Sequence, residues 1–355
     1  MGIFWGRSWA APRSRRTPVS KRPGKPRRAP ASTHPYSALT PDLIIEAVEA
    51  LGHVCDGRIL ALNSYENRVY QVGRDEGGPV VVKFYRPGRW TTPAILEEHE
   101  FALELARVEL PVVAPDVHDG RSLFELGGFR YAVYPREGGR WPELGTKDDR
   151  QWMGRFLARI HGIGRTHSFR HRPKLDWRVL GRETADYLLD QGWIPSHIEA
   201  AYESLADDVL ALVEQRFAEA APYRMLRLHG DCHPGNVLWT DKGPHFVDLD
   251  DCMMGPAVQD LWMLLSGRPE EMTVQLGDVL EGYGEFADFD YHEIALIEPL
   301  RTLRIMHYAG WLARRWDDPA FPRAFPWFEE PKYWEEHVLN LREQLSAMEE
   351  PPLTP

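Results

Sequence analysis

The stretch LHGDCHPGNVLWTDKGPHFVDLDD, residues 228–251, brings carboxylates, imidazoles, a thiol and an amide together in one short segment. The flanking segments have the apolar spacing of helices, whereas this one predicts a loop and then a small β-hairpin, NVLW and HFVDL around TDKG. Two kinds of site fit these residues. Either Cys232 and the histidines hold a structural metal ion, or the carboxylates bind a metal ion that arrives with a substrate.

The composition is that of a globular protein. Of the 355 residues, 43% are hydrophobic, which is enough to bury one large core or two smaller ones. No run reaches the roughly 18 uncharged apolar residues of a membrane helix, so we expect no membrane span and no membrane partner. The only cysteines, Cys55, Cys232 and Cys252, are too few and too far apart for a disulfide framework, which favours a cytoplasmic location.

The net charge of −11 is unevenly distributed. Residues 1–33 carry nine of the 42 Lys and Arg residues and no acidic residue, so the rest of the chain has a charge of −20. Such an acidic body argues against a nucleic-acid partner. The first 33 residues are rich in Pro, Arg and Ser and have no hydrophobic period, which predicts a disordered basic tail.

The remaining pattern predicts an α+β fold of two lobes. A helix is expected over residues 41–51, where Thr40 can act as the N-cap and Pro41 occupies the first turn. Strands are expected at 59–64, 67–72 and 79–85, then a helix opening at Thr92-Pro93, then two further strands. We predict an antiparallel-sheet N-lobe over residues 34–137 and a helical C-lobe over residues 138–355.

Several common sites are excluded by spacing. Cys232, His233 and Cys252 lack the CxxC or HxxxH clip of a zinc site. The GxGxxA match at residues 282–287 follows a helical segment rather than a strand, so it does not predict dinucleotide binding. The chain contains no GxxxxGK[ST], HExxH or GxSxG, which excludes P-loop enzymes, zincins and α/β-hydrolases.

Phosphoryl transfer fits the opening stretch better. It needs an acid that orients the attacking hydroxyl, oxygen ligands for Mg²⁺ and a cation on the phosphates. Asp231, Asn236 and Asp248 supply the acid and the ligands in order, and the first two have the spacing of the kinase loop HRDxxxxN. Asp250 and Asp251 could bind a second metal ion or brace the loop.

A cation for the phosphates is also present at the expected place. Lys83 lies on the third expected strand, in VVVKFY, as a phosphate-binding lysine should. The helix that follows offers Glu97 or Glu98 to pair with it. His229 and Asp260 fit a structural role that ties the catalytic loop to the following helix. The basic and histidine-rich segment 161–172 is expected to be a solvated loop.

Two levels of resemblance support this interpretation. HGDCHPGN, residues 229–236, resembles the HGDxHxxN motif of the aminoglycoside-phosphotransferase/choline-kinase-like group, which shares the protein-kinase fold. Longer segments resemble the bacterial stress response kinase A family of Ser/Thr protein kinases, over about residues 36–353. These segments include LNSYENRVYQV, VVKFYRPGRW, ILEEHEFALEL, FVDLDD, GPAVQDLWMLL and PLRTLRIMHYAGWLARRWDDPAFP.

The resemblance implies an ATP- and Mg²⁺-dependent kinase acting on Ser and Thr residues of proteins in a bacterial stress response. The fold implied is protein-kinase-like and of the aminoglycoside-phosphotransferase type, with a nucleotide-binding N-lobe and a C-lobe that carries the catalytic loop and the substrate groove. Asp231 is implied as the catalytic aspartate. Asn236 and Asp248 are implied as Mg²⁺ ligands, with Asp248 also counted as catalytic.

Three further roles follow from the same resemblance. Lys83 would bind the α- and β-phosphates, Ser64 would lie in the flap over ATP, and Glu98 is favoured over Glu97 as the lysine partner. Two features depart from typical protein kinases: residues 63–67 replace the glycine-rich loop, and DLD at 248–250 replaces DFG with no APE segment after it. We therefore expect no control by activation-loop phosphorylation.

Two other functions stay open. An alcohol kinase of the choline, homoserine or aminoglycoside type would suit an acidic pocket with aromatic walls. A pseudokinase that only scaffolds partners would require the loss of Lys83, Asp231 or Asp248, and all three are present. The expected partners are ATP and protein substrates, with autophosphorylation as a further outcome, and the chain is expected to be a monomer.

Overall fold

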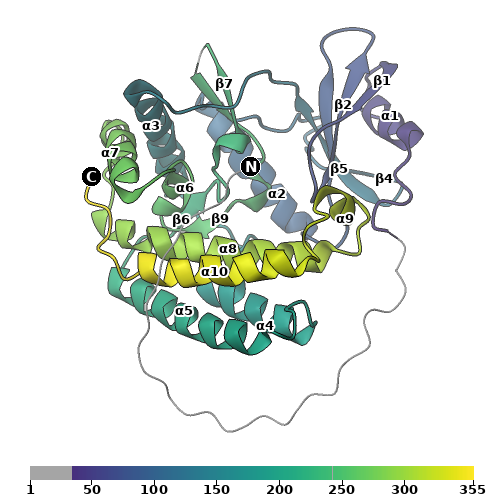
Figure 1. The fold of residues 1–355 in the computed structure, drawn as a ribbon. Coiled ribbons are helices and arrows are strands. Elements are labelled where there is room, and N and C mark those ends of the chain that lie inside the picture. Colours follow the sequence, from purple (N-terminus) through teal and green to yellow (C-terminus); the bar gives the residue numbers. More distant parts are fainter. Residues whose placement is uncertain (1–33, 242) are drawn as a thin grey trace. The chain divides into compact units, whose positions relative to one another are not determined.

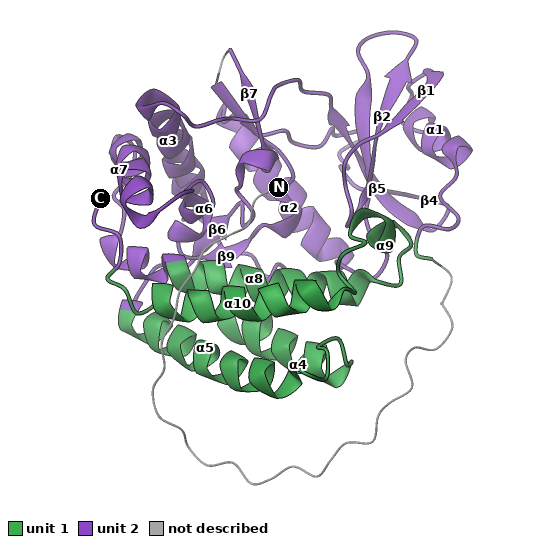
Figure 2. Cartoon of the chain, in the orientation of Figure 1, with its two compact units in different colours: residues 1–35, 176–219, 298–351 green, residues 36–175, 220–297, 352–355 purple. Residues whose placement is uncertain are grey.

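The computed structural model describes residues 34–241 and 243–355, so the predicted basic tail lies outside the described residues. These residues divide into two compact units (Figure 2). One unit holds residues 36–175, 220–297 and 352–355, and the other holds His34, Pro35 and residues 176–219 and 298–351. The lobe boundary at residues 137 and 138 stays a prediction.

The unit that holds residues 36–175, unit 2 in Figure 2, contains the expected antiparallel sheet (Figure 1). Its strand order is β1-β2-β3-β5-β4. The strands are β1 (Cys55–Ala61), β2 (Arg68–Arg74), β3 (Val80–Phe84), β4 (Phe124–Leu126) and β5 (Phe129–Pro135). Every neighbouring pair is antiparallel. Short turns join β1 to β2, β2 to β3 and β4 to β5, whereas a longer segment that includes a helix lies between β3 and β5.

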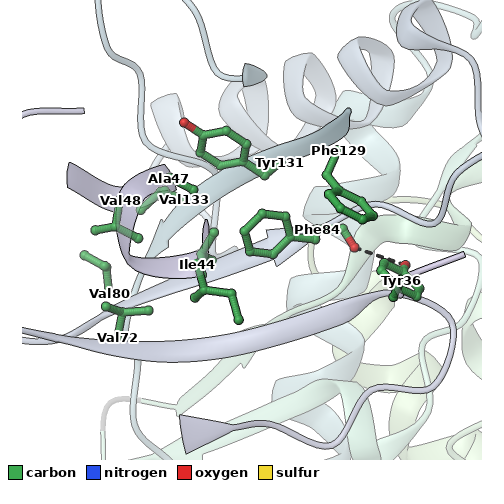
Figure 3. Close-up of a cluster of buried hydrophobic side chains, with 11 residues drawn as sticks. Tyr36, Ile44, Ala47, Val48, Val72, Val80, Phe84, Phe129, Tyr131 and Val133 are labelled. Carbon is green, nitrogen blue, oxygen red and sulfur yellow. Dashed lines mark hydrogen bonds between the residues drawn. The ribbon is translucent and has the colours of Figure 1, made fainter. Parts of the chain in front are cut away.

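One face of this sheet packs against α1 (Pro41–Glu49), whose first turn is capped by the Thr40 side chain. Val80, Val82 and Phe84 of β3 belong to the buried cluster between them, much of which Figure 3 shows. Because side chains alternate across a strand, Val81 and Lys83 point to the opposite face. The hydrophobic pattern of β3 therefore directs the lysine away from this cluster.

Helix α2 (Thr92–Arg107) follows β3 in the same unit. The Thr91 hydroxyl accepts the N–H of Ala94 at 3.3 Å, and Pro93 occupies the first turn, so the helix starts where the sequence predicts. Its buried residues recur at helical spacing. Glu98 falls within this buried stripe, three residues after Ile95 and three before Phe101.

The rest of this unit carries the opening stretch. Its helices are α3 (Lys147–Gly164), α6 (Val258–Trp262) and α7 (Pro269–Gly284), with short 3-10 turns at Pro234–Asn236, Leu249–Asp251 and Tyr291–Leu296. Strand β6 (Leu226–Leu228) pairs with β9 (Met253–Gly255), and β7 (Val237–Thr240) pairs with β8 (Gly243–Phe246). The predicted hairpin is confirmed as β7 and β8. The pairing of β6 with β9 brings the two ends of the opening stretch together, so that the loop and the hairpin lie between two paired strands.

The other unit, unit 1 in Figure 2, is helical. It contains α4 (Glu183–Asp190), α5 (Glu199–Ala220), α8 (Ile297–Arg315), α9 (Ala320–Ala324), α10 (Pro331–Ala347) and a π-helical turn at Arg178–Arg182. The buried Thr302 hydroxyl donates to Gln344 Oε1 at 2.9 Å and so joins α8 to α10, which run side by side (Figure 1). Within the described ranges, no helix is both long and apolar enough to cross a membrane.

Candidate active site

Lys83 is the centre of a buried cluster of charges. Its Nζ lies 3.1 Å from a carboxylate oxygen of each of three residues, Glu98, Asp248 and Asp250. Burial lowers the pKa of Lys83, but the charges of Asp250, Glu98 and Asp248 outweigh it and raise the pKa well above its usual value. The lysine therefore stays protonated although only 6% of it is exposed.

The structure separates the two candidate lysine partners. Glu98 contacts Lys83 and is itself 3% exposed, and burial raises its pKa to about 7 against the opposing charge of Lys83. Glu97 points elsewhere: its carboxylate accepts three successive backbone N–H groups, from residues 170, 171 and 172, at 2.7, 2.8 and 2.9 Å. The preference for Glu98 as the residue that meets Lys83 agrees with this geometry.

The catalytic loop is held by Asp260. The backbone N–H groups of His229 and Gly230 donate to its two oxygens at 2.9 and 2.8 Å, and His161 Nε2 lies 3.1 Å from it. Gly230 has a φ of +85°, and a Cβ there would collide with the Asp251 carbonyl, so glycine is required at this turn. The expected tie between this loop and α6 is present.

Asp231 and Asn236 form a local pair. Asn236 Nδ2 donates to the Asp231 carbonyl at 3.0 Å and to its carboxylate at 3.3 Å, and His233 Nε2 lies 3.4 Å from the same carboxylate. These contacts fix the amide nitrogen of Asn236, so its carbonyl oxygen is the atom suited to a hard cation.

The hairpin brings Asp248 back to Asn236. The backbone N–H of Val247 donates to the backbone carbonyl of Asn236 at 3.0 Å, which leaves the side-chain oxygen of Asn236 out of this bond. His229 Nε2 lies 2.9 Å from the backbone carbonyl of Val247. Asp248 has left-handed backbone angles, with φ +58° and ψ +67°, although it is not glycine. Its side chain is 52% exposed, which leaves the carboxylate open to solutes while one oxygen contacts Lys83.

A cavity of about 270 Å³ collects most of the predicted site residues. Its polar lining includes Ser64, Lys83, Glu98, Asn236 and Asp248. Its apolar lining includes Leu62, Val69, Val81, Ala102, Val113, Leu238 and Leu249. Asp231 does not line this cavity. A larger hollow beside Trp152 and Trp239 contains none of the predicted residues.

Ser64 lies on the cavity wall and also shapes its turn. Its hydroxyl donates to the Asn67 carbonyl at 3.2 Å, and the buried Asn67 side chain accepts the backbone N–H of Arg86 at 3.1 Å. The turn at residues 63–67 is therefore attached to the segment after β3. A turn-forming role and a place beside a bound nucleotide are compatible for Ser64.

The donors present fit Mg²⁺ and not zinc. In the part of the chain that the structure describes, no group of three or more Cys, His, Asp or Glu side chains is arranged to hold a metal ion by itself. Cys232 and Cys252 are fully buried free thiols, and burial raises the pKa of both. Asp248 and Asn236 offer oxygen donors, which a hard cation prefers when other ligands come from phosphates and water.

The expectation that the basic segment 161–172 is a solvated loop holds for the exposed His167, Arg170 and His171 but is wrong for two other residues. His161 and Arg172 are buried, with 0% and 4% exposure, instead of lying in a solvated loop. Arg172 donates to the backbone carbonyls of Asp250 and Cys252, which compensates its burial.

Asp250 is also buried. Burial alone would raise the pKa of its carboxyl, but the charges of Arg89, Lys83 and Arg172 lower that pKa below the usual value. It therefore pairs with cations of the protein, which agrees with the expected alternative that Asp250 braces the loop.

The comparisons with known proteins agree with this geometry. The sequence matches the phosphotransferase enzyme family over residues 58–297. Stress response kinase A of Escherichia coli K12 is 46% identical over 322 residues, which cover 91% of this chain and 97% of that protein. The serine/threonine protein kinase RdoA of Salmonella typhimurium LT2 is 44% identical over 318 residues, covering 90% and 96%.

Solved structures show the same fold at low identity. Amicoumacin kinase hAmiN, in complex with AMP-PNP, Ca²⁺ and Ami, has a TM-score of 0.65 at 18% identity and covers 88% of this chain and 95% of its own. Spectinomycin phosphotransferase APH(9)-Ia, with ADP and spectinomycin, has a TM-score of 0.63 at 16% identity, covering 87% and 98%.

Fold and site thus define an enzyme of the phosphotransferase class. The chain belongs to the phosphotransferase enzyme family and, within it, to the stress response kinase A family. The predicted α+β, protein-kinase-like fold of aminoglycoside-phosphotransferase type is confirmed. The resemblance to the stress response kinase A family and the kinase function are also confirmed.

Proposed function

We propose that this kinase uses MgATP to phosphorylate Ser and Thr residues of proteins in a bacterial stress response. The observation that carries the proposal is that Lys83, Glu98, Asn236 and Asp248 line the same cavity in a chain 46% identical to Stress response kinase A. The name of the Salmonella relative supports a protein acceptor. The low number of cysteines supports a cytoplasmic location, and the chain is proposed to act as a monomer with lobes at residues 34–137 and 138–355.

The residues divide the work of nucleotide binding. The apolar cavity lining suits an adenine ring, and Ser64 lies on the wall where a flap would cover the phosphates. Lys83, kept charged and pointed by Glu98, would neutralise the α- and β-phosphates. Asp248 and Asn236 would hold Mg²⁺, which when bound neutralises charge on the β- and γ-phosphates.

Asp231 would orient the attacking hydroxyl and accept its proton. Asp231 lies outside the lining of the nucleotide cavity, and its contacts with Asn236 and His233 hold the carboxylate beside the proposed metal ligand. A carboxylate in this position would act on a hydroxyl that approaches the γ-phosphate from outside the cavity.

The experiment is a transfer assay with γ-labelled ATP and Mg²⁺, with the protein alone and with a generic Ser/Thr protein substrate. We expect label as phosphoserine or phosphothreonine, and we expect Asp231→Ala to abolish it while nucleotide binding is kept. Full turnover by Asp231→Ala would refute the catalytic assignment. Label on the kinase itself in the first reaction would identify autophosphorylation.

A small-molecule alcohol kinase is the second candidate. The observation in its favour is the −20 charge of the body outside the basic tail, which suits cationic acceptors such as aminoglycosides or choline. The similar solved structures include kinases named for amicoumacin and spectinomycin. ATP consumption that requires an added small alcohol, with no label on protein, would favour this candidate over a protein acceptor.

A further inference from the structure

The loop at residues 248–252, which we call the metal loop, is held by two arginines from distant segments, the half-buried Arg89 and the buried Arg172. Arg89, just after β3, pairs with the carboxylates of both Asp250 and Asp251. Arg172, on the segment after α3, donates to the backbone carbonyls of Asp250 and Cys252. One arginine therefore fixes side chains of the metal loop, and the other fixes its backbone.

Trp90 connects the two arginines. The guanidinium carbon of Arg172 lies 4.1 Å from the centre of the Trp90 ring system, and that of Arg89 lies 5.1 Å from it. Guanidinium groups pack well against an indole, because the ring presents a negative face to the cation. The three side chains form a bracket, defined here as Arg89, Trp90 and Arg172, around residues 250–252.

The bracket extends to the turn beside the nucleotide cavity. Glu66, within the 63–67 turn, has a carboxylate oxygen 3.0 Å from Arg86 Nε and 3.8 Å from Arg89 Nε. Arg89 thus faces carboxylates on two sides, Glu66 on the turn and Asp250 and Asp251 on the metal loop. Burial opposes its charge, but those acids raise the pKa of Arg89 far above its ordinary value, so it stays protonated.

Asp250 transmits this arrangement to Lys83. Its Oδ1 lies 3.1 Å from Lys83 Nζ, the same distance as the nearest oxygens of Glu98 and Asp248. A buried carboxylate that faced Lys83 without a second cation would hold the lysine more strongly and would repel phosphates. Arg89 balances that charge, so Asp250 can position Lys83 without competing fully with a nucleotide.

The backbone of the metal loop also needs external support. Asp248 adopts a positive φ without being glycine, which is strained and persists only where the surroundings impose it. Typical kinases have DFG followed by an APE segment here, whereas this chain has DLD and no APE. The bracket holds the residues directly after Asp248 and could replace that support.

We propose that Arg89 is a positioning residue for phosphoryl transfer: by pairing with Asp250 it places Lys83 for the phosphates, and with Trp90 and Arg172 it keeps Asp248 in its metal-binding conformation. This inference rests on the proposed roles of Lys83 and Asp248. Arg89 itself would contact neither ATP nor the metal ion nor the acceptor. Asp250 would act as a fixed anion between Lys83 and Arg89.

The test compares Arg89→Met in two backgrounds, the natural sequence and Asp250→Asn, by direct titration of the full-length protein with MgADP. In the natural sequence we expect about tenfold weaker binding, because Asp250 is left without its balancing cation. In the Asp250→Asn background, the same change should weaken binding by less than about threefold, because the charge between Lys83 and Arg89 is already gone and only Asp251 and Glu66 still face Arg89. In the transfer assay, KM for ATP should rise with kcat nearly unchanged.

Arg130→Met is the matched control. The Arg130 guanidinium donates to the Trp90 carbonyl at 2.7 Å and to the Thr92 hydroxyl at 3.2 Å, so its loss disturbs the same segment without touching a carboxylate of the metal loop. We expect unchanged MgADP affinity in this variant. If Arg89→Met does not fold, Arg89→Lys replaces it. A lysine can still pair with Asp250, so we expect a smaller loss of MgADP affinity, and Arg130→Lys should show no loss.

The outcomes separate the inference from the proposed function. Equal weakening by Arg89→Met in both backgrounds, or no weakening in either, would overturn the positioning role. A natural-sequence protein that does not bind MgADP would instead remove the nucleotide site itself. Weakening that depends on Asp250, with the Arg130 control unaffected, supports the inference.

Discussion

The Glu97 carboxylate offers the sharpest test of how α2 is anchored. It accepts the backbone N–H groups of residues 170, 171 and 172, one on Oε1 and two on Oε2. In Glu97→Gln only one oxygen remains, so at least one of the three bonds is lost and the others lose their charge. Hydrogen bonds to a charged group contribute about 1.5–3 kcal/mol each, and Glu97 is half-buried, so we expect local destabilisation of about 2 kcal/mol.

Hydrogen exchange measures this local effect directly. A loss of about 2 kcal/mol corresponds to roughly 30-fold faster exchange of the amides at residues 170–172. Glu100→Gln is the matched control, because Glu100 lies on the exposed side of the same helix and its change should stay within about 0.5 kcal/mol. Unchanged exchange in Glu97→Gln, or equal acceleration in Glu100→Gln, would refute the reasoning. Glu98, the next residue, contacts Lys83, so faster exchange at residues 170–172 should be accompanied by weaker nucleotide binding.

Three further predictions concern the metal ligand, pH and the tail. Asp248→Ala should abolish the strengthening of ADP binding by Mg²⁺, and titrations with and without Mg²⁺ that still differ as in the natural sequence would contradict the metal role. Burial raises the pKa of the Glu293 carboxyl from 4.5 to about 7. The protonated carboxyl therefore contributes fully to the stability of the fold below about pH 4.5, and this contribution is lost as the pH rises through 7. The shift corresponds to a change of about 3 kcal/mol in the free energy of unfolding. Glu293→Gln should remove that part of the pH dependence of thermal unfolding, and parallel curves for the two proteins would exclude it. Deletion of residues 1–33 should leave phosphotransfer unchanged, and an inactive truncation would show that the tail belongs to the enzyme.

Local sequence signals accounted for the elements that carry the site. Thr40, Thr91 and Thr146 cap helices as short polar side chains do, and the pattern VVVKFY predicted that Lys83 lies on the third strand, where it is found in β3. The spacing of Asp231 and Asn236 predicted a kinase-type loop, and in the structure the two side chains meet within it. These signals are local, because caps, alternation and tight turns depend on neighbours a few residues away.

The choice between Glu97 and Glu98 needed the tertiary structure. Adjacent residues on a helix point about 100° apart, so both could not face Lys83, but the sequence around them is polar enough to fit either orientation. The packing of α2 buries Glu98 and turns Glu97 toward residues 170–172.

The sequence alone thus determined the family, the fold class and the order of Lys83, Asp231, Asn236 and Asp248, because each depends on short motifs and their spacing. The tertiary structure decided that Arg89 and Arg172 pack against a loop 161 and 78 residues away in the chain, with Arg89 half-buried and Arg172 buried. Isolated arginines look like solvated surface charges, and here the carboxylate and carbonyl groups of residues 250–252 compensate their loss of water. The positions of those partners follow from the fold and not from any local pattern.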